Sequence, residues 1–441
     1  MAALPIAAAS SRWTAARMWD LRLACRGVFR QNPAMAQILP IISDTPSASR
    51  VDWLGAVHSQ MHAVVDSGIV EVFNYGRNRQ GLIPLWVGEG DLATPEFIAE
   101  AARLSLARGE TFYTYQRGIP ELRETIARYM TRIYGAAPGG GAHQPERFFV
   151  TIGGMHALQI AMRLVAGPGD EIVIPSPAWP NFDGAIALAG ARSVNVPMVS
   201  GARWSLDIDR LAAAITPATR AIIVNSPGNP TGFTATLAEL AAILDLSRRH
   251  GLWIVADEIY GRVVYQGERA PSFHDVMDPD DRILFLQTLS KNWAMTGWRI
   301  GWLEAPPALG PIIENAIQYT TSGVPVFIQR AAIAAIEEGE SFIADQLSRM
   351  KQSRDIICGG LAATGRVRFA RPEAAFYLFC SVDGEEDTRT LAKRLVDEAG
   401  LGVAPGSAFG AGGEGYIRLC FARSPEQIAE ATRRFAAWLA R

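Results

Sequence analysis

A lysine stands at position 291, in the segment TLSKNWAMTGWRIGW that covers residues 288–302. The chain holds 42 lysines and arginines, and all of them except Lys291, Lys351 and Lys393 are arginines. Arginine stays protonated and is a poor nucleophile, whereas a lysine amine can form an imine with a carbonyl and move a proton. Lys291 is therefore the first candidate for chemistry in this sequence.

Several residues suit a bound phosphate group. They are Thr288, Ser290 and Arg299 around the lysine, and Gly153, Gly154 and Met155 in FFVTIGGMHALQIAMRLV. The second segment is typical of a strand, a glycine turn and a helix, so free N–H groups would lie at the positive end of the helix. A tight turn without a ligand would use the same glycines, and this segment alone leaves both interpretations open.

Two polar side chains follow apolar strands. Asn229 lies in IIVNSPGNPTGF, whose prolines and glycines would also satisfy an ordinary turn, and Asp257 ends the strand in LWIVADEIY. A carboxylate at the end of a buried strand is costly unless a cation pairs with it. A ligand with a phosphate, a basic nitrogen for Asp257 and a carbonyl for Lys291 would match all these groups. Pyridoxal phosphate has these three features.

The order and spacing of these motifs resemble the class I/II pyridoxal-phosphate-dependent aminotransferases of fold type I, the aspartate aminotransferase-like family. The resemblance extends from about Leu82 to Ala422. It rests on NPTG, ADEIY and SKNWAMTGWRIGW, with support from GEGDLATP (88–95), YTYQRGIPELRE (113–124) and YIRLCFA (416–422). Gly90 departs from the pattern because the family often has proline there.

The resemblance implies a role for each candidate residue. Lys291 would form a Schiff base with the cofactor, Asp257 would pair with the pyridine nitrogen, and Trp179 in SPAWPNF would stack on the ring. Tyr260 and Asn229 would bond the ring hydroxyl oxygen. The phosphate would be held by Gly153, Gly154, Met155, Thr288, Ser290 and Arg299, and by Tyr113 from the neighbouring subunit. An ordinary core position would explain Trp179 equally well.

The resemblance also implies that Arg418 binds the substrate α-carboxylate, with help from Asn229, Trp179 and the backbone near Gly88. In YIRLCFA the alternation of a strand puts Arg418 on the face opposite Ile417. An arginine in a half-buried strand favours a bidentate anion. A substrate carboxylate and a structural salt bridge both provide one, and the sequence leaves both open.

The activity implied is transfer of the amino group of an α-amino acid to a 2-oxo acid, by a ping-pong mechanism through an aldimine on Lys291. A β-lyase on the same fold would use the same lysine and is the alternative. A non-catalytic cofactor-binding regulator would need a DNA-binding module, and no helix-turn-helix pattern or basic face precedes Leu82. The resemblance further implies a homodimer with shared active sites.

The substrate side chain is less clearly indicated. Aromatic residues near the expected site favour aromatic amino acids or a broad range of substrates; they are Trp86, Phe112, Tyr115 and Trp293. Family members specific for dicarboxylates carry a second arginine in a stretch that cannot be aligned here, so acidic substrates are neither supported nor excluded.

Short apolar strands alternate with amphipathic helices, which predicts an α/β fold with a mainly parallel sheet and helices on both faces. We expect strands at 147–152, 171–175, 221–226, 252–258, 283–288 and 299–305, and a helix near 53–68. Long helical segments with two further strands predict a smaller α+β domain. The expected limits are 86–327 for a large cofactor-binding domain and 328–441 for a small domain, which residues 35–85 join.

One further motif is misleading. GAGGEG at 410–415 matches the dinucleotide-binding fingerprint, but a strand follows it where the fingerprint requires a helix. We interpret it as a loop.

Composition excludes several classes of protein. A net charge of −2 without a long Lys/Arg run argues against a nucleic-acid partner, and no apolar stretch is long enough to cross a membrane. The four cysteines form no CxxC pair and the six histidines lie at no metal-ligand spacing beside them. We therefore expect reduced thiols in a cytoplasmic protein and no metal site.

Residues 1–34 differ from the rest, with five arginines and a single acid, Asp20. This composition resembles a mitochondrial transit peptide, and it also fits a start placed upstream of a true start at Met35. In both cases we expect an unstructured extension outside the folded core.

Overall fold

The computed structural model describes residues 52–64 and 66–441. Its contacts separate two units, Met1–Val57 and His58–Arg441, and we describe the second by itself. Residues 1–34 lie outside the described residues, so both interpretations of that segment stay predictions. The helix predicted near 53–68 is wrong for most of its length. Within the second unit, α2 covers only Ser59–His62, and α3 (Gly68–Gly76) follows it.

A seven-stranded sheet forms the centre of this unit, with the order β2-β8-β7-β6-β5-β3-β4. The strands are β2 (Phe148–Thr151), β3 (Glu171–Ser176), β4 (Arg192–Pro197), β5 (Thr219–Asn225), β6 (Trp253–Asp257), β7 (Ile283–Thr288) and β8 (Gly301–Glu304). Strands β3 to β7 pair in parallel, and β8 pairs antiparallel with both its neighbours. The sequence did not predict β4, because this edge strand is polar and only partly buried.

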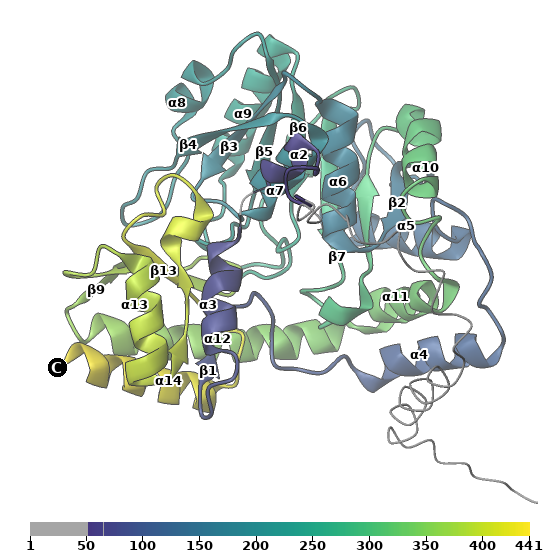
Figure 1. The fold of residues 1–441 in the computed structure, drawn as a ribbon. Coiled ribbons are helices and arrows are strands. Elements are labelled where there is room, and N and C mark those ends of the chain that lie inside the picture. Colours follow the sequence, from purple (N-terminus) through teal and green to yellow (C-terminus); the bar gives the residue numbers. More distant parts are fainter. Residues whose placement is uncertain (1–51, 65) are drawn as a thin grey trace, which may run out of the picture. The chain divides into compact units, whose positions relative to one another are not determined.

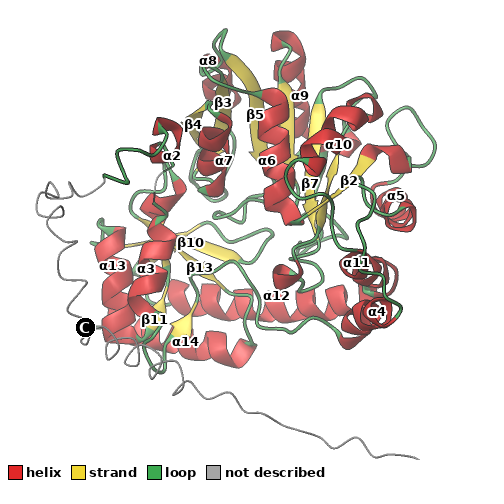
Figure 2. Ribbon diagram, turned by 45° about the vertical axis from the view of Figure 1, so that its right-hand side comes forward, coloured by secondary structure: helices red, strands yellow, loops and turns green. Residues whose placement is uncertain are grey.

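Helices cover both faces of this sheet, as Figures 1 and 2 show. In β5, Ala221 and Ile223 pack with α6 (Gly153–Val165), α7 (Asn181–Ala189) and α10 (Gly310–Gln318). The alternate residues Ile222 and Val224 pack with α8 (Ile208–Ala213) and α9 (Leu237–His250). Burying such a side chain contributes roughly 1.5–3 kcal/mol. A strand that is apolar on both faces therefore requires both helix layers, which confirms the predicted α/β fold.

A second, antiparallel sheet has the order β12-β13-β10-β9. Its strands are β12 (Ala404–Pro405), β13 (Tyr416–Cys420), β10 (Tyr377–Val382) and β9 (Val367–Phe369), and β1 (Ile83–Pro84) pairs separately with β11 (Leu401–Gly402). The helices α12 (Glu340–Ala362), α13 (Thr388–Arg394) and α14 (Pro425–Leu439) contribute to the same apolar core. Val72 of α3 and Ile83 of β1 are buried in it as well. The domain limits drawn from the sequence stay predictions.

A third apolar cluster joins α4 (Glu96–Ala107), α5 (Pro120–Tyr134) and α11 (Val326–Glu338). The long helical segment predicted after residue 328 is interrupted at Gly339, between α11 and α12. A Cβ at Gly339 would lie 2.6 Å from the indole of Trp293, so the close packing of Trp293 requires glycine there. The short helical turns are η2 (Pro145–Arg147), η3 (Phe273–Asp275), η4 (Thr296–Trp298), η5 (Pro307–Leu309), η6 (Leu395–Ala399) and η7 (Gly406–Phe409).

The fold also bears on the GAGGEG motif and on membrane-spanning helices. The glycines of GAGGEG lie between η7 and β13, and no helix follows them, so the motif is a loop and not a dinucleotide site. Among the described residues, no helix is both long and apolar enough to cross a membrane.

Candidate active site

The carboxyl ends of three neighbouring strands converge on one cavity. Asn225 at the end of β5 lies directly across the parallel ladder from Asp257 at the end of β6. Thr288 ends β7, next to β6. All three residues line a cavity of about 400 Å³. Parallel sheets bind their ligands at this edge, so the strand order alone gathers these side chains.

Nearly all of the predicted site residues line this cavity. They are Gly88, Gly154, Met155, Trp179, Asn229, Asp257, Tyr260, Thr288, Ser290, Lys291, Arg299 and Arg418. Gly153 lies just outside it. Tyr113 does not reach it, since its side chain is 95% exposed and borders a separate groove with residues 321–327.

Lys291 follows β7 and reaches back into the cavity. Its Nζ donates a 2.7 Å hydrogen bond to the carbonyl oxygen of Gly88. Burial lowers the pKa of Lys291 to about 8. The amine is therefore much closer to its neutral, nucleophilic form near neutral pH than an exposed lysine would be.

Asp257 is the only acid among the described residues that line the cavity. Burial raises the pKa of its carboxyl group to about 7, although the backbone N–H of Ile259 donates to it. The adjacent Glu258 faces away and accepts hydrogen bonds from Ser272 and from the backbone N–H of Phe273. The cavity thus presents one carboxylate that forms no ion pair with a cation of the described residues, and a cationic ligand atom would stabilise its charge.

Tyr260 is joined to a tyrosine of the second sheet. The hydroxyl oxygens of Tyr260 and Tyr377 lie 2.6 Å apart, and burial raises the pKa of both phenols. The Tyr377 hydroxyl also fills the space that a Cβ at Gly88 would occupy. Glycine at position 88 is therefore what allows this pair to form beside the lysine.

Arg418 lies on β13, is 2% exposed and has its guanidinium 4.6 Å from the centre of the Tyr377 ring. It donates hydrogen bonds to the Asn229 side chain at 2.8 Å and to the Trp86 carbonyl oxygen. Among the described residues, its Nε has no hydrogen-bond partner and its guanidinium forms no ion pair with a carboxylate. The structural salt bridge that the sequence left open is not found in the described part of the chain.

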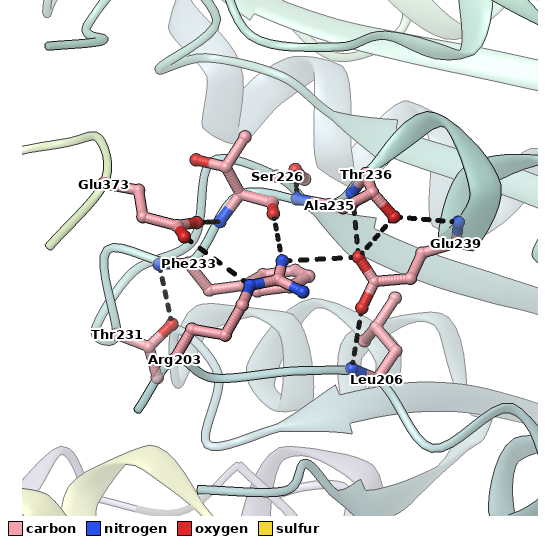
Figure 3. Close-up of polar contacts among 10 residues, drawn as sticks. Arg203, Leu206, Ser226, Thr231, Phe233, Ala235, Thr236, Glu239 and Glu373 are labelled. Atoms are coloured by element: carbon pink, nitrogen blue, oxygen red, sulfur yellow. Dashed lines mark hydrogen bonds and ion pairs between the residues drawn. The ribbon is translucent and has the colours of Figure 1, made fainter. Parts of the chain in front are cut away.

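The loop that carries Asn229 is anchored on both sides. Figure 3 shows Arg203 between the carboxylate of Glu239 and the backbone of this loop, with a hydrogen bond of 2.8 Å to a loop carbonyl. Thr236 and Glu239 form a capping box at the start of α9, and the Ser226 hydroxyl accepts from the backbone across the loop. At the tip, the Asn229 N–H donates to Asn225 at 2.8 Å. Asn229 is thereby fixed beside Arg418.

The amino-terminal end of α6 faces Arg299. Gly153 begins this helix with φ +69°, and a Cβ there would lie only 2.7 Å from Nη2 of Arg299. Arg299 donates to the Thr296 carbonyl oxygen at 2.7 Å and forms no ion pair with a described carboxylate. The hydroxyls of Thr288 and Ser290 lie 3.0 Å apart nearby. A helix terminus, two hydroxyls and a guanidinium form a favourable anion site.

Some cavity residues were missed by the sequence analysis. They are Asn181, Asn225, Tyr377 and the α3 side of the cavity, formed by Ser67, Ile69, Val70 and Phe73. Asn225 could have been found, since it ends a predicted strand next to Asp257. Nothing in the sequence indicated that the residues of α3 belong to the site, because they lie far along the chain from the motifs that supply the other site residues. Of the four aromatic residues that the sequence analysis connected with the substrate side chain, only Trp86 lines the cavity, and Trp293 is fully buried in the core.

Comparison with known proteins shows the family of this chain. The family described as aminotransferase class I and II matches residues 80–435. The chain belongs to this family. It is 34% identical over 368 residues to the aspartate/prephenate aminotransferase of Thermus thermophilus, covering 82% of this chain and 93% of that one. It is 32% identical over 382 residues to aromatic-amino-acid aminotransferase 2 of Thermococcus litoralis, covering 86% and 97%.

The chain is also similar to solved structures of aminotransferases. The aspartate aminotransferase of Thermus thermophilus with maleate superposes with a TM-score of 0.80 at 33% identity, covering 86% of this chain and 99% of that one. Members of the family use pyridoxal 5′-phosphate, and this aminotransferase is a pyridoxal-phosphate-dependent enzyme. The relatives named for different substrates are about equally similar to it, so identity alone does not name its substrate.

The cavity of the aminotransferase fits this cofactor. Arg299 and Arg418 provide two cationic groups without carboxylate partners in the described chain, and the Nε of Arg418 is buried without a hydrogen bond. Asp257 is a buried carboxylate that forms no ion pair among the described residues, and Lys291 is a buried amine. A ligand with a phosphate, a ring nitrogen that can carry a proton and an aldehyde complements all of these groups, and an amino acid carboxylate would complete the set.

Proposed function

We propose that the enzyme moves the amino group of an α-amino acid to a 2-oxo acid by a ping-pong mechanism. The observation that carries the proposal is the arrangement of four groups around one 400 Å³ cavity. They are the Lys291 amine, the Asp257 carboxylate and two guanidinium groups without carboxylate partners in the described part of the chain. The amino acid leaves its amino group on the enzyme and departs as a 2-oxo acid. A second 2-oxo acid then takes the group away.

Each residue has a separate task in this proposal. The cofactor, when bound, draws electrons away from the substrate Cα. Asp257 keeps a proton on the ring nitrogen by placing a negative charge beside it. Tyr260 and Asn229 bond the ring oxygen, and Trp179 covers the ring. The phosphate is held by Gly153, Gly154, Met155, Thr288, Ser290 and Arg299.

Arg418 orients the substrate. Its guanidinium can grip the α-carboxylate with two parallel hydrogen bonds, and Asn229 and Tyr377 fix the plane of the guanidinium. With the carboxylate held there, the Cα hydrogen is directed toward the Lys291 amine. Lys291 is then the base that removes this proton and the acid that returns it on the neighbouring atom. Its lowered pKa suits both directions of transfer.

We propose that the substrate side chain is aromatic or otherwise apolar. The wall of the cavity contributed by α3 consists of Ile69, Val70 and Phe73, with Trp86 and Val87 beside it. Among the described residues that line the cavity, the only cations are Lys291, Arg299 and Arg418, and each already has a role. The described part of this chain therefore offers the cavity no further cation for a side-chain carboxylate.

The test is a set of half-reactions without an acceptor. Holoenzyme is mixed with phenylalanine, tyrosine, leucine, aspartate or cysteine, and the cofactor absorption and the products are followed. We expect one equivalent of 2-oxo acid per site, fastest with aromatic substrates and slowest with aspartate. Continuous release of ammonia and pyruvate from cysteine would instead identify a β-lyase. Faster turnover of aspartate than of phenylalanine would contradict the proposed substrate class.

We also propose a homodimer in which Tyr113 reaches the phosphate of the neighbouring site. Phe112, Tyr113 and Tyr319 are 84%, 95% and 87% exposed, which is unusual for aromatic residues. Phe112 and Tyr113 border a groove with residues 321–327. A second copy would bury this surface. Light scattering at micromolar concentration should give twice the mass of the chain, and a monomer with full activity would refute the shared site.

A further inference from the structure

Three buried ligand-type side chains meet away from the active-site cavity. His143 lies in the connection between α5 and η2, His274 in η3, and Glu304 at the end of β8. One ring nitrogen or carboxylate oxygen from each lies within 4.8 Å of the others. Their exposed fractions are 3%, 8% and 0%. None of the three lines the cofactor cavity.

The polar atoms of this cluster are incompletely satisfied. Neither ring nitrogen of His143 has a hydrogen-bond partner among the residues that the structure describes, and the same holds for His274. The Oε1 atom of Glu304 accepts a 2.9 Å hydrogen bond from Arg147. Its Oε2 lies 3.2 Å from Nε2 of His274, the distance of an ion pair. Buried polar groups without partners are uncommon, and each requires an explanation.

A buried ion pair between His274 and Glu304 explains only part of this arrangement. It would account for the 3.2 Å contact, but it would leave both nitrogens of His143 without partners. The ring of His143 nevertheless lies against that of His274, with centroids 5.2 Å apart and planes at 75°. A third group that accepts lone pairs from both rings and from the carboxylate would give one nitrogen of each ring and the Oε2 atom of Glu304 a partner.

We propose that His143, His274 and Glu304 bind a divalent transition metal ion, with Zn²⁺ as the best match. Two imidazoles and one carboxylate are a common ligand set for this ion, and water can occupy a fourth position. Bonds of about 2.0–2.1 Å place tetrahedral ligand atoms roughly 3.4 Å apart. The 3.2 Å contact between His274 and Glu304 already matches this spacing, whereas any pair near the 4.8 Å limit must move closer on binding. Arg147 occupies the other oxygen of Glu304 and leaves Oε2 directed at the histidines.

The site would have a structural role. In the β7–β8 ladder, Glu304 is paired with Phe285, whereas the cavity residue Thr288 is paired with Gly301, so the cluster lies toward the opposite end of these strands. The connection that carries His143 includes Gly139, Gly140 and Gly141, all with positive φ. Such a segment loses much conformational entropy on folding. A metal ion would fix it to the sheet and thereby stabilise the folded chain.

The test is the metal content of purified holoenzyme. Wild type, His143→Ala and His250→Ala are dialysed against micromolar Zn²⁺ and then against metal-free buffer, and retained zinc is measured by mass spectrometry. His250 is an exposed residue of α9 and serves as the matched control. We expect one zinc per chain in wild type and His250→Ala, and binding weaker by more than about 100-fold in His143→Ala. If all three proteins retain equal amounts of zinc, the binding is adventitious and the proposed site is refuted. The site is also refuted if the wild type retains no zinc.

A second measurement does not depend on a variant that folds. X-ray absorption at the zinc edge of the wild-type holoenzyme should show two imidazole ligands with oxygen in the remaining positions. A sulfur ligand, or oxygen ligands alone, would overturn the proposal. The melting temperature of the wild type should also rise with added Zn²⁺ and fall on chelation, while that of a folded His143→Ala protein should not respond.

Discussion

The guanidinium of Arg418 donates a 2.8 Å hydrogen bond to the side-chain oxygen of Asn229, which lies 189 residues earlier in the chain. The first residue comes from β13 of the antiparallel sheet and the second from the loop after β5 of the large sheet. This contact connects the expected carboxylate site to the expected cofactor site. Any loss of its geometry should therefore weaken substrate binding before it affects the rest of the fold.

Replacing Arg418 by lysine tests this relationship. Lysine keeps the charge but cannot make two parallel hydrogen bonds to a carboxylate. A hydrogen bond to a charged group contributes about 1.5–3 kcal/mol, so we expect KM for the amino acid to rise roughly 10- to 100-fold. Cofactor affinity should change little. The control is Arg354→Lys, because Arg354 also stacks on a buried tyrosine, 4.2 Å from the Tyr265 ring, but lies outside the cavity.

The carboxyl group of Asp257 should make the cofactor-free protein sensitive to pH. Its pKa in the folded chain is raised by burial to about 7, so the folded state keeps a proton that the unfolded chain has lost. The stability from this proton is present below about pH 4 and is lost as the pH rises through about 7, at about 1.4 kcal/mol per pH unit. The Asp257→Asn variant has no carboxyl group at this position, so its stability should not fall with pH for this reason.

The measurement compares the melting temperatures of the two cofactor-free proteins between pH 4 and pH 8. The variant should gain stability relative to wild type as the pH rises. Added pyridoxal phosphate should stabilise the wild type more than the variant and should reverse the order above pH 7. A difference that does not vary with pH would mean that Asp257 is not the buried acid inferred here.

The amine of Lys291 should control the rate of cofactor capture. Only the neutral amine attacks an aldehyde, and burial lowers the pKa of Lys291 to about 8. The rate constant for binding pyridoxal phosphate to the cofactor-free protein should therefore rise with pH and reach half its maximum near pH 8. Stopped-flow absorbance between pH 6.5 and 9.5 measures it. A midpoint above pH 10 would indicate an amine in contact with water.

Much of this site could be predicted from the sequence, because its residues lie in short motifs at strand ends. Asp257 and Lys291 each stand in a segment whose local pattern restricts their place, and parallel strands bring such ends together. Phe73 and Tyr377 could not be placed in the same way, since their positions depend on how α3 and β10 pack in a separate core. The cluster of His143, with residues from three distant segments, has no sequence spacing that would indicate it.

Gly153 should be intolerant of a side chain. At φ +69° an alanine is strained by roughly 1 kcal/mol, and its Cβ would displace Arg299, whose Nη2 lies 2.7 Å from that position. We expect Gly153→Ala to weaken binding of both pyridoxal phosphate and inorganic phosphate, measured by calorimetry. Gly267→Ala is the control, because Gly267 has φ +74° and its nearest neighbour atom is 3.9 Å away. It should lose similar stability but retain phosphate binding.

The central claim is that Lys291 carries the cofactor, and the chain makes this claim easy to test because it contains only two other lysines, Lys351 and Lys393. Borohydride reduction fixes a cofactor that is joined to a lysine, and peptide mass spectrometry then locates the added mass. We predict that all of the added mass lies in the peptide with Lys291 and none in the other two. Added mass at Lys351 or Lys393 in an active preparation, with Lys291 unmodified, would contradict the account.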